Sequence, residues 1–389
     1  MKIVLAPDSF KGSLSAHQVC TAMAAGIQRV YPNSEIIQIP MADGGEGTLQ
    51  AIIESTEGRL LHRTVTGPLG DKVAAEFGIL PDQQTAIIEM ASASGLTLIP
   101  EPMRNPCIAS SIGTGQLILA ALDEGCRRLV LGIGGSATND GGVGIAEALG
   151  YRFLDADGRP LPPGGLALLN LARIDADHIN PRLKDLEVKV ICDVTNPLTG
   201  PEGASLVYGP QKGADPATAR LLDQALGQLA KRIQTDLGLN LLDLPGGGAA
   251  GGTGAGLVAF LGAQLKSGVE LVADLVGLAN KIRDADLVIT GEGRIDRQTR
   301  YGKVPFGVTR IAKELHIPVF AIAGQIGHGA HELHTCGMDG ILSISDGTMT
   351  MEDAMKNADI LVETAAEELV RIFFTGRNSG VANLSTITG

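Results

Sequence analysis

Short apolar runs alternate with amphipathic segments at both ends of the chain. Each run leads into a polar, glycine-containing loop, and apolar residues then recur at helical spacing. Ser15 and Gln18 stand three residues apart where the first amphipathic segment begins, which is the spacing of a helix capping box. We expect strands over 3–6, 35–40, 286–290, 318–323 and 340–345, and helices over 15–30, 49–53, 305–315 and 353–374.

The middle of the chain follows a different pattern from about Gly58 onward. Short alternating segments separated by Gly and Pro turns extend from Leu60 to Ile99, which favours antiparallel or mixed strands. Further elements of the middle are expected over 115–124 and 217–237 for helices, and over 128–133 and 188–192 for strands.

The two ends together predict a doubly wound, five-stranded parallel sheet, with a second α/β domain inserted into it. We place the first domain at residues 1–59 plus 275–374 and the inserted domain at 60–274. Residues 375–389 are polar and without periodicity, so we expect a loose tail there.

Composition and charge narrow the class of protein. Apolar residues make up 44% of the chain, aromatic residues 3%, and there is no Trp, so the cores are expected to consist of Ala, Val, Ile and Leu. The formal charge of −12 argues against nucleic acid or an anionic membrane as the main partner. The five cysteines are scattered, which fits a reducing compartment. Pro7 and Asp8 interrupt the initial apolar run, so it is not a signal peptide, and no apolar stretch is long enough to span a bilayer. We therefore expect a cytoplasmic protein.

Glycine-rich, polar loops follow most of the predicted strands. Ligands of parallel sheets bind beyond the carboxyl ends of the strands, and glycine lets backbone N–H groups approach phosphate oxygens. The loops cover residues 7–13, 43–47, 134–142, 192–197, 246–256, 291–296 and 324–327. One such loop is more often only a tight turn, but their number favours an anionic ligand. None has the Walker, protein-kinase or complete dinucleotide-binding pattern.

These loops contain the groups that phosphoryl transfer to an alcohol requires. Cations hold phosphate oxygens, one carboxylate holds Mg²⁺, and another accepts the hydroxyl proton. The candidate cations are Lys11, Arg294 and Lys303, and the candidate carboxylates are Asp8, Asp43, Asp193 and Asp296. Asp193 directly follows a strand and is favoured as the base. Asp43 is the candidate metal ligand, although Asp8 and Asp43 could instead cap turns.

Other loop residues are candidates for contact with substrate or nucleotide. They share small side chains or hydrogen-bonding groups suited to phosphate or carboxylate oxygens. They are Ser9, Gly44, Gly45, Gly134, Gly135, Ser136, Asn139, Gly251, Gly252, Gly291 and Glu292, beside Arg294 and Lys303. The histidines at 328, 331 and 334 have no carboxylate partner pattern, so we assign them to no metal site.

Five long motifs resemble those of the type-1 glycerate kinases, the bacterial glycerate 2-kinases. They are Ala6 to Ser15, Ala42 to Thr48, Gly132 to Gly142, Cys192 to Gly203 and Thr290 to Asp296, and the likeness extends from Met1 to about Phe374. The resemblance implies a flavodoxin-like domain split by an inserted domain with a restriction-enzyme-like core. It also implies ATP-dependent phosphorylation of (R)-glycerate (D-glycerate), giving 2-phosphoglycerate in glyoxylate or glucarate catabolism, with ATP and Mg²⁺ as cofactors.

Three alternatives stay open at this point. Phosphorylation at the 3-hydroxyl would give 3-phosphoglycerate, since the same loops could orient either hydroxyl. A non-catalytic two-domain protein that binds hydroxy acids would have a similar pattern. A nicotinamide-dependent dehydrogenase is disfavoured, because the third glycine of the dinucleotide fingerprint is absent after Gly293. The oligomeric state and the domain that binds the nucleotide do not follow from the sequence.

Overall fold

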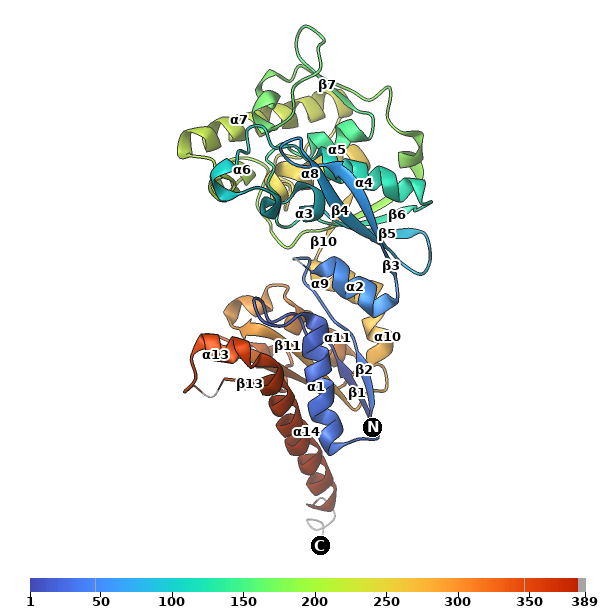
Figure 1. Cartoon of the computed structure of the whole chain (residues 1–389), viewed down its shortest axis with the longest axis vertical. Helices are drawn as coiled ribbons and strands as arrows, with labels where there is room; N and C mark the ends of the chain where they lie inside the picture. The colour runs from blue at the N-terminus through green and yellow to red at the C-terminus, as the bar shows by residue number, and fades with distance from the viewer. Residues whose placement is uncertain (46, 346, 384–389) are drawn as a thin grey trace. The chain divides into compact units, whose positions relative to one another are not determined.

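The computed structural model describes residues 1–45, 47–345 and 347–383, and it contains two compact units (Figure 1). Unit 1 consists of residues 1–43, 50–55 and those from Val269 on, and unit 2 consists of residues 44–49 and 56–268. Because short segments between 43 and 56 belong alternately to the two units, the domain limits 1–59, 60–274 and 275–374 stay a prediction.

Unit 1 is built on five parallel strands in the order β13-β12-β11-β1-β2. The strands are β1 (Lys2–Leu5), β2 (Glu35–Gln38), β11 (Leu287–Ile295), β12 (Val319–Ile326) and β13 (Gly340–Ser343). Numbered along unit 1, this order is 2-1-3-4-5, the flavodoxin-like arrangement of doubly wound sheets. Strands β11 and β12 pair as far as Ile295 and Ile326, beyond their predicted ends. Glu292 and Arg294 therefore lie in a strand, not in the loop expected from their glycine neighbours.

Two long helices pack together against one face of this sheet. Ile3 and Leu5 of β1, at alternate positions, share a buried core with residues of α1 (Ala16–Val30) and α14 (Ala358–Asn383). The predicted capping box is confirmed, because the Ser15 side chain accepts from Gln18 N–H and the Gln18 side chain accepts from Ser15 N–H. Outside residues 56–268, or at their ends, the other helices are α2 (Thr48–Thr56), α9 (Gly268–Leu275), α10 (Leu278–Ile282), α11 (Val304–Glu314), α12 (Glu332–Thr335) and α13 (Met351–Lys356).

The helix expected over 353–374 differs from the prediction at both ends. It is two helices, because α13 ends at Lys356 and is capped by Asn357, whose side chain donates to the backbone carbonyl of Asp353, and α14 begins at Ala358. Helix α14 continues past Phe374 to Asn383, since no proline interrupts it. Residues 375–383 are thus helical where a loose tail was expected, and 384–389 lie outside the described residues.

Unit 2 contains a mixed six-stranded sheet in the order β10-β9-β6-β5-β4-β3. The antiparallel part follows the alternating segment of the sequence, and β5, β6, β9 and β10 are parallel. The strands are β3 (Arg59–Thr66), β4 (Lys72–Ile79), β5 (Thr85–Glu89), β6 (Arg128–Gly132), β9 (Glu187–Ile191) and β10 (Gln264–Lys266), and β7 (Arg152–Leu154) pairs with β8 (Arg173–Asp175) apart from them. The predicted α/β class with an inserted domain of mixed strands agrees with this arrangement.

The helices of unit 2 pack into apolar cores, one of which includes strands of the six-stranded sheet. They are α3 (Ala91–Ser94), α4 (Ile112–Asp123), α5 (Val143–Ala148), α6 (Ala204–Tyr208), α7 (Pro216–Arg232) and α8 (Ala249–Leu261). Short 3-10 helices of unit 2 cover Leu96–Leu98, Glu101–Met103, Gly165–Asn170, Pro181–Asp185 and Pro210–Lys212, and a π-helical turn covers Ile233–Leu237. In unit 1, a 3-10 helix covers Arg297–Arg300. No helix in the described part of the chain has both the length and the apolar character needed to cross a membrane.

The contact between α1 and α14 depends on a glycine. A Cβ at Gly26 would lie 2.0 Å from the backbone carbonyl oxygen of Glu363, so only glycine allows this approach. Arg29, one turn further along α1, pairs with Glu363 and Glu367 across the same contact. The two helices are therefore held together by backbone proximity and by surface charge.

We expect Gly26→Ala to lower the free energy of unfolding by about 1–3 kcal/mol, because the added methyl group forces the helices apart. The matched control is Gly376→Ala on α14, where a Cβ meets no atom within 4 Å of the described structure. Helix propensity alone makes that control more stable by up to about 1 kcal/mol. Urea unfolding followed by circular dichroism measures both, and equal shifts of the two variants would contradict the close contact.

Candidate functional site

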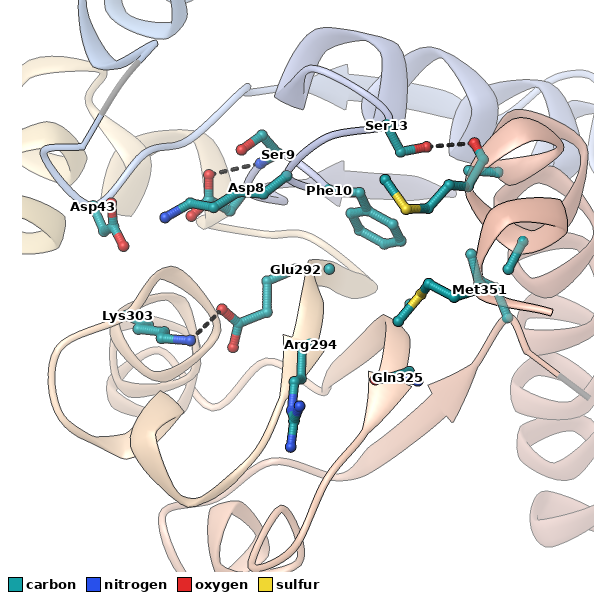
Figure 2. A pocket seen from close by; sticks show the side chains of 17 residues that line it. Asp8, Ser9, Phe10, Ser13, Asp43, Glu292, Arg294, Lys303, Gln325 and Met351 are labelled. Atoms are coloured by element: carbon teal, nitrogen blue, oxygen red, sulfur yellow. Dashed lines mark hydrogen bonds and ion pairs between the residues drawn. The ribbon is translucent and has the colours of Figure 1, made fainter. Parts of the chain in front are cut away.

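A cavity of about 330 Å³ lies in unit 1, where β1, β11 and β12 end. Its charged half is lined by Asp8, Lys11, Asp43, Glu292, Arg294 and Lys303. Its apolar half is lined by Phe10, Ile344, Met351, Ala354, Met355 and Ala358. Figure 2 shows Asp43 and Lys303 at one end of the cavity and Phe10 and Met351 at the other. Six predicted residues, which lie far apart along the chain after β1, after β2, in β11 and just before α11, thus share one cavity, together with Ser9.

Asp8 is a buried carboxylate of the charged half. Its backbone N–H donates to the carbonyl of Gly291 at 2.8 Å, which fixes the residue beside β11, and its Oδ1 accepts the N–H of Ser9 at 2.6 Å. Only 7% of Asp8 is exposed. Burial, reinforced by the negative charges of Asp43 and Glu292, raises the pKa of Asp8 to about 7. A carboxyl group with this pKa can accept a proton near neutral pH.

The buried Glu292 and the half-buried Lys303 form an ion pair opposite Asp8 (Figure 2). Glu292 accepts a hydrogen bond of 2.5 Å from the Thr299 hydroxyl and one of 3.2 Å from Lys303 Nζ. Burial raises the pKa of Glu292 although both partners favour its charged form. Lys303 therefore places a positive charge at a fixed position in the cavity. The Glu292 carboxylate beside it is already hydrogen-bonded to Thr299 and Lys303.

Two further cations are better placed to meet a ligand. The Arg294 side chain is 62% exposed and pairs with Asp296 at 3.1 Å. Lys11 lies on the exposed turn between β1 and α1, where Gly12 has a left-handed φ of 78°. The backbone N–H groups of Lys11 and Gly12 have no acceptor among the described residues. This turn thus presents backbone donors and an ammonium group together, as anion-binding loops do.

Two predicted residues of the 291–296 motif have structural contacts and do not line the cavity. Asp296 caps the 3-10 helix Arg297–Arg300: its Oδ1 accepts the N–H of Gln298, and its own N–H donates to the Thr299 hydroxyl. Gly291 lies in β11, where a Cβ would stand 2.3 Å from the carbonyl oxygen of Ile322. A catalytic role of Asp296 and a binding role of Gly291 stay predictions.

The other predicted residues belong to unit 2. Asp193 follows β9, and its Oδ1 accepts the N–H of Gly268 at 2.9 Å. Gly44 lies close to Asp193, because a Cβ at Gly44 would be 3.6 Å from Asp193 Oδ2. The carbonyl of Gly45 accepts from the Thr48 hydroxyl, and Glu46 between them lies outside the described residues.

The loop after β6, residues 134–142, is hydrogen-bonded to a buried lysine, Lys212, which was not among the predicted residues. Lys212 Nζ donates to Ser136 Oγ at 2.9 Å and to the carbonyl of Thr138 at 2.6 Å. Burial lowers the pKa of Lys212 to about 7. In the sequence, Lys212 follows Gly209-Pro210-Gln211 and reads as an ordinary exposed turn residue, so nothing there indicated its burial.

Candidate ligand groups on the same loop are also buried. Asn139 donates to Ser205 Oγ at 2.9 Å. Its Oδ1 and Thr138 Oγ1 lack partners within the described structure. Gly251 has left-handed backbone angles, and its Cα lies so close to the loop that a Cβ would be 2.1 Å from the Thr138 carbonyl oxygen. Gly252 is also left-handed, and Gly134 and Gly135 precede the buried stretch. Ligand contact by these residues stays a prediction.

A preformed metal cage is not seen in the described residues, since no three His, Cys, Asp or Glu side chains converge to hold an ion. The carboxylates of the charged half, Asp8, Asp43 and Glu292, nevertheless line one cavity. Mg²⁺ in nucleotide sites is commonly held by one or two carboxylates together with phosphate oxygens and water. The donor set of the cavity therefore fits a magnesium ion that arrives with a nucleotide.

We expect Asp8→Asn to raise the free energy of unfolding at pH 8 by about 2 kcal/mol, because the folded protein no longer holds an ionised carboxylate in a buried place. The ordinary pKa of an aspartate, 3.8, lies below the folded value of about 7, so wild-type stability falls as pH rises between them. The difference between variant and wild type thus grows from about pH 4 to pH 7 and is constant above.

Urea unfolding at several pH values, in buffer with a chelator and no divalent ion, measures this difference. Asp157→Asn is the control, since Asp157 is exposed and its removal is expected to have no comparable pH dependence. A variant at Asp8 that is less stable than wild type at pH 8 would contradict the account of its pKa.

Comparison with known proteins places the chain in a family. The model of the glycerate kinase family matches residues 3–374. A glycerate kinase of Halalkalibacterium halodurans is 51% identical over 94% of this chain and 97% of its own length. The glycerate 2-kinase of Escherichia coli K12 is 48% identical over 98% of this chain and 100% of its own.

A solved structure agrees with both the fold and the family. A crystal structure of a candidate glycerate kinase 2 from Salmonella typhimurium LT2 has a TM-score of 0.89 and 49% identity to this chain, and it covers 97% of this chain and 99% of its own. The predicted α/β fold and the resemblance seen in the motifs are thus confirmed. The chain belongs to the glycerate kinase family of phosphotransferases.

Proposed function

We propose that this chain is an ATP-dependent kinase that phosphorylates (R)-glycerate at its 2-hydroxyl and releases 2-phosphoglycerate and ADP. The observation that carries the proposal is the charged half of the unit 1 cavity, where a buried carboxylate of raised pKa faces several cations. The name of the Escherichia coli relative, a glycerate 2-kinase, supports the choice of the 2-hydroxyl.

Asp8 is the proposed base. Its burial beside Asp43 and Glu292 makes proton uptake favourable near neutral pH. As Asp8 takes the proton of the 2-hydroxyl, the hydroxyl oxygen forms a bond to the γ-phosphorus, and the bond from that phosphorus to the bridging oxygen breaks. ADP leaves with the electron pair of the broken bond.

The cations of the cavity are proposed to bind and orient the two substrates. Lys11, together with the backbone N–H groups of Lys11 and Gly12, which meet no acceptor among the residues the structure describes, suits phosphate oxygens, which accept several donors at once. Arg294 is exposed enough to turn from Asp296 toward the carboxylate of glycerate, which an Arg fork binds through two hydrogen bonds. Lys303 adds positive charge from the position that Glu292 fixes.

Asp43 is the proposed carboxylate partner of Mg²⁺, because it lines the cavity without the deep burial of Asp8. When bound, the ion neutralises charge on the β- and γ-phosphate oxygens. The unit 2 residues Gly44, Gly45, Gly134, Gly135, Ser136, Asn139, Gly251 and Gly252 are proposed to contact substrate or nucleotide, as is Ser9 in unit 1. We further propose that the enzyme acts in the cytoplasm, in the catabolism of glyoxylate or glucarate.

The test is an assay of ADP release with ATP, Mg²⁺ and D-glycerate, combined with ³¹P NMR of the product. We expect glycerate-dependent ADP release, with 2-phosphoglycerate as product. Asp8→Asn is expected to lower kcat by about 10²–10⁴-fold, the usual contribution of a general base, while the exposed control Asp157→Asn keeps wild-type kinetics.

Each other outcome changes a stated part of the proposal. Loss of kcat in Asp193→Asn, with Asp8→Asn active, would move the base to the residue favoured from the sequence. A 3-phosphoglycerate product would correct the hydroxyl. Tight glycerate binding without ADP release would identify a binding protein and reject the kinase.

A further inference from the structure

The apolar half of the unit 1 cavity has no task in the transfer step described above. Glycerate consists of a carboxylate and two hydroxyl-bearing carbons, so it gains little from apolar walls. The walls are nevertheless extensive, because α13 and the start of α14 contribute Met351, Ala354, Met355 and Ala358. This part of the cavity therefore fits a different portion of a ligand.

The turn between β1 and α1 connects the two halves. Lys11 lines the cavity with an ammonium group, and the residue before it, Phe10, lines the apolar half. Two residues further on, the Ser13 hydroxyl donates to the carbonyl of Met355 at 2.7 Å and ties the turn to α13. A ligand that places phosphate groups at Lys11 thus extends along the turn toward Phe10 and Met355.

The residues of the apolar half suit a flat aromatic ring. Phe10 lines this half as a largely buried aromatic wall, 3% exposed. Methionine side chains adapt their shape and make favourable sulfur contacts with aromatic rings. Met351 is 55% exposed and Met355 is 38% exposed, so both keep apolar surface that a bound ring would cover. Figure 2 shows Met351 projecting into the cavity at the end where Phe10 lies.

We infer that the apolar half of the unit 1 cavity holds the base of the nucleotide, with its phosphates extending along the Lys11 turn to the charged half. Unit 1 is then the nucleotide-binding unit. This inference rests on the proposed function in taking a nucleoside triphosphate as the phosphoryl donor, and it adds the place where the base binds and the residues that contact it.

The decisive variant is Ala354→Phe, which fills the apolar half and leaves every residue of the charged half unchanged. Calorimetric titration with ADP, and separately with inorganic tripolyphosphate, distinguishes binding of the base from binding of phosphate. We expect at least about a tenfold loss of ADP affinity, since a filled pocket removes the contacts of a whole ring. Tripolyphosphate affinity and the KM for glycerate are expected to stay unchanged.

Ile360→Phe is the matched control, because Ile360 is 60% exposed on α14 and does not line the cavity. It is expected to bind ADP as the wild type does. Met355→Ala is the second variant and guards against misfolding of Ala354→Phe, since shortening an exposed side chain leaves the fold intact. Its expected result is an about three- to tenfold loss of ADP affinity from the lost apolar contact.

Wild-type ADP affinity in folded Ala354→Phe and in Met355→Ala would overturn the inference. A higher KM for glycerate with unchanged ADP affinity would overturn it too, because the apolar half would then belong to the acceptor. The proposed function fails independently of this result: ADP binding that depends on Ala354 in a protein without glycerate-dependent ADP release would reject the kinase and retain the nucleotide site.

Discussion

The site of unit 1 depends on the pairing of β1 with β11, which joins two segments that are far apart in the sequence. Ile3, Val4 and Leu5 align with Leu287, Val288 and Ile289. Beyond the ends of this register, Thr290 Oγ1 donates to the carbonyl of Ala6, and the N–H of Asp8 donates to the carbonyl of Gly291. These bonds bring Asp8 within electrostatic range of Glu292. Residues 56–268 of unit 2 lie between β1 and β11 along the chain. Pairing of these two strands therefore closes a long loop and costs conformational entropy.

Bringing these carboxylates together destabilises the folded chain and prepares it for proton transfer. Asp43 and Glu292 oppose ionisation of Asp8, and burial opposes it further. Lys303 and Thr299 offset the burial of Glu292, whereas within the described part of the chain the Asp8 carboxylate accepts one hydrogen bond, from the N–H of Ser9. Because Asp8 is buried and has fewer hydrogen-bond donors than Glu292, its pKa of about 7 lies near neutral pH, whereas Glu292 is hydrogen-bonded to Thr299 and Lys303. Such sites exchange stability for reactivity.

Most helices and strands, and many residues of the unit 1 cavity, could be predicted from the sequence. Ser15 and Gln18 marked the start of α1 because a capping box is a local interaction that needs no tertiary contact. Asp8, Lys11, Glu292, Arg294 and Lys303 could be grouped because the carboxyl ends of parallel strands meet at one edge of a sheet. The family followed from motif resemblance, since glycine-rich loops alone do not name a substrate.

Other features depend on packing that one sequence does not reveal. Met351 and Met355 have the spacing of an ordinary amphipathic helix, so nothing in the chain indicated that α13 lines the cavity. Lys212 carries a charge on a Gly-Pro turn, and nothing in the sequence indicates that its ammonium group is buried against Ser136 and Thr138. Asp296 looked catalytic in its motif, and its capping of the next turn became visible only with the fold.

The central claim is that Asp8, in unit 1, receives the proton of the glycerate hydroxyl. A crystal structure of this chain with a non-hydrolysable ATP analogue, Mg²⁺ and D-glycerate tests it most directly. The account predicts the 2-hydroxyl within about 2.6–3.2 Å of an Asp8 carboxylate oxygen, the range in which a general base accepts a proton, with the γ-phosphoryl group on the opposite side of that hydroxyl. A 2-hydroxyl bonded instead to Asp193, with Asp8 out of reach of the ligand, would contradict it.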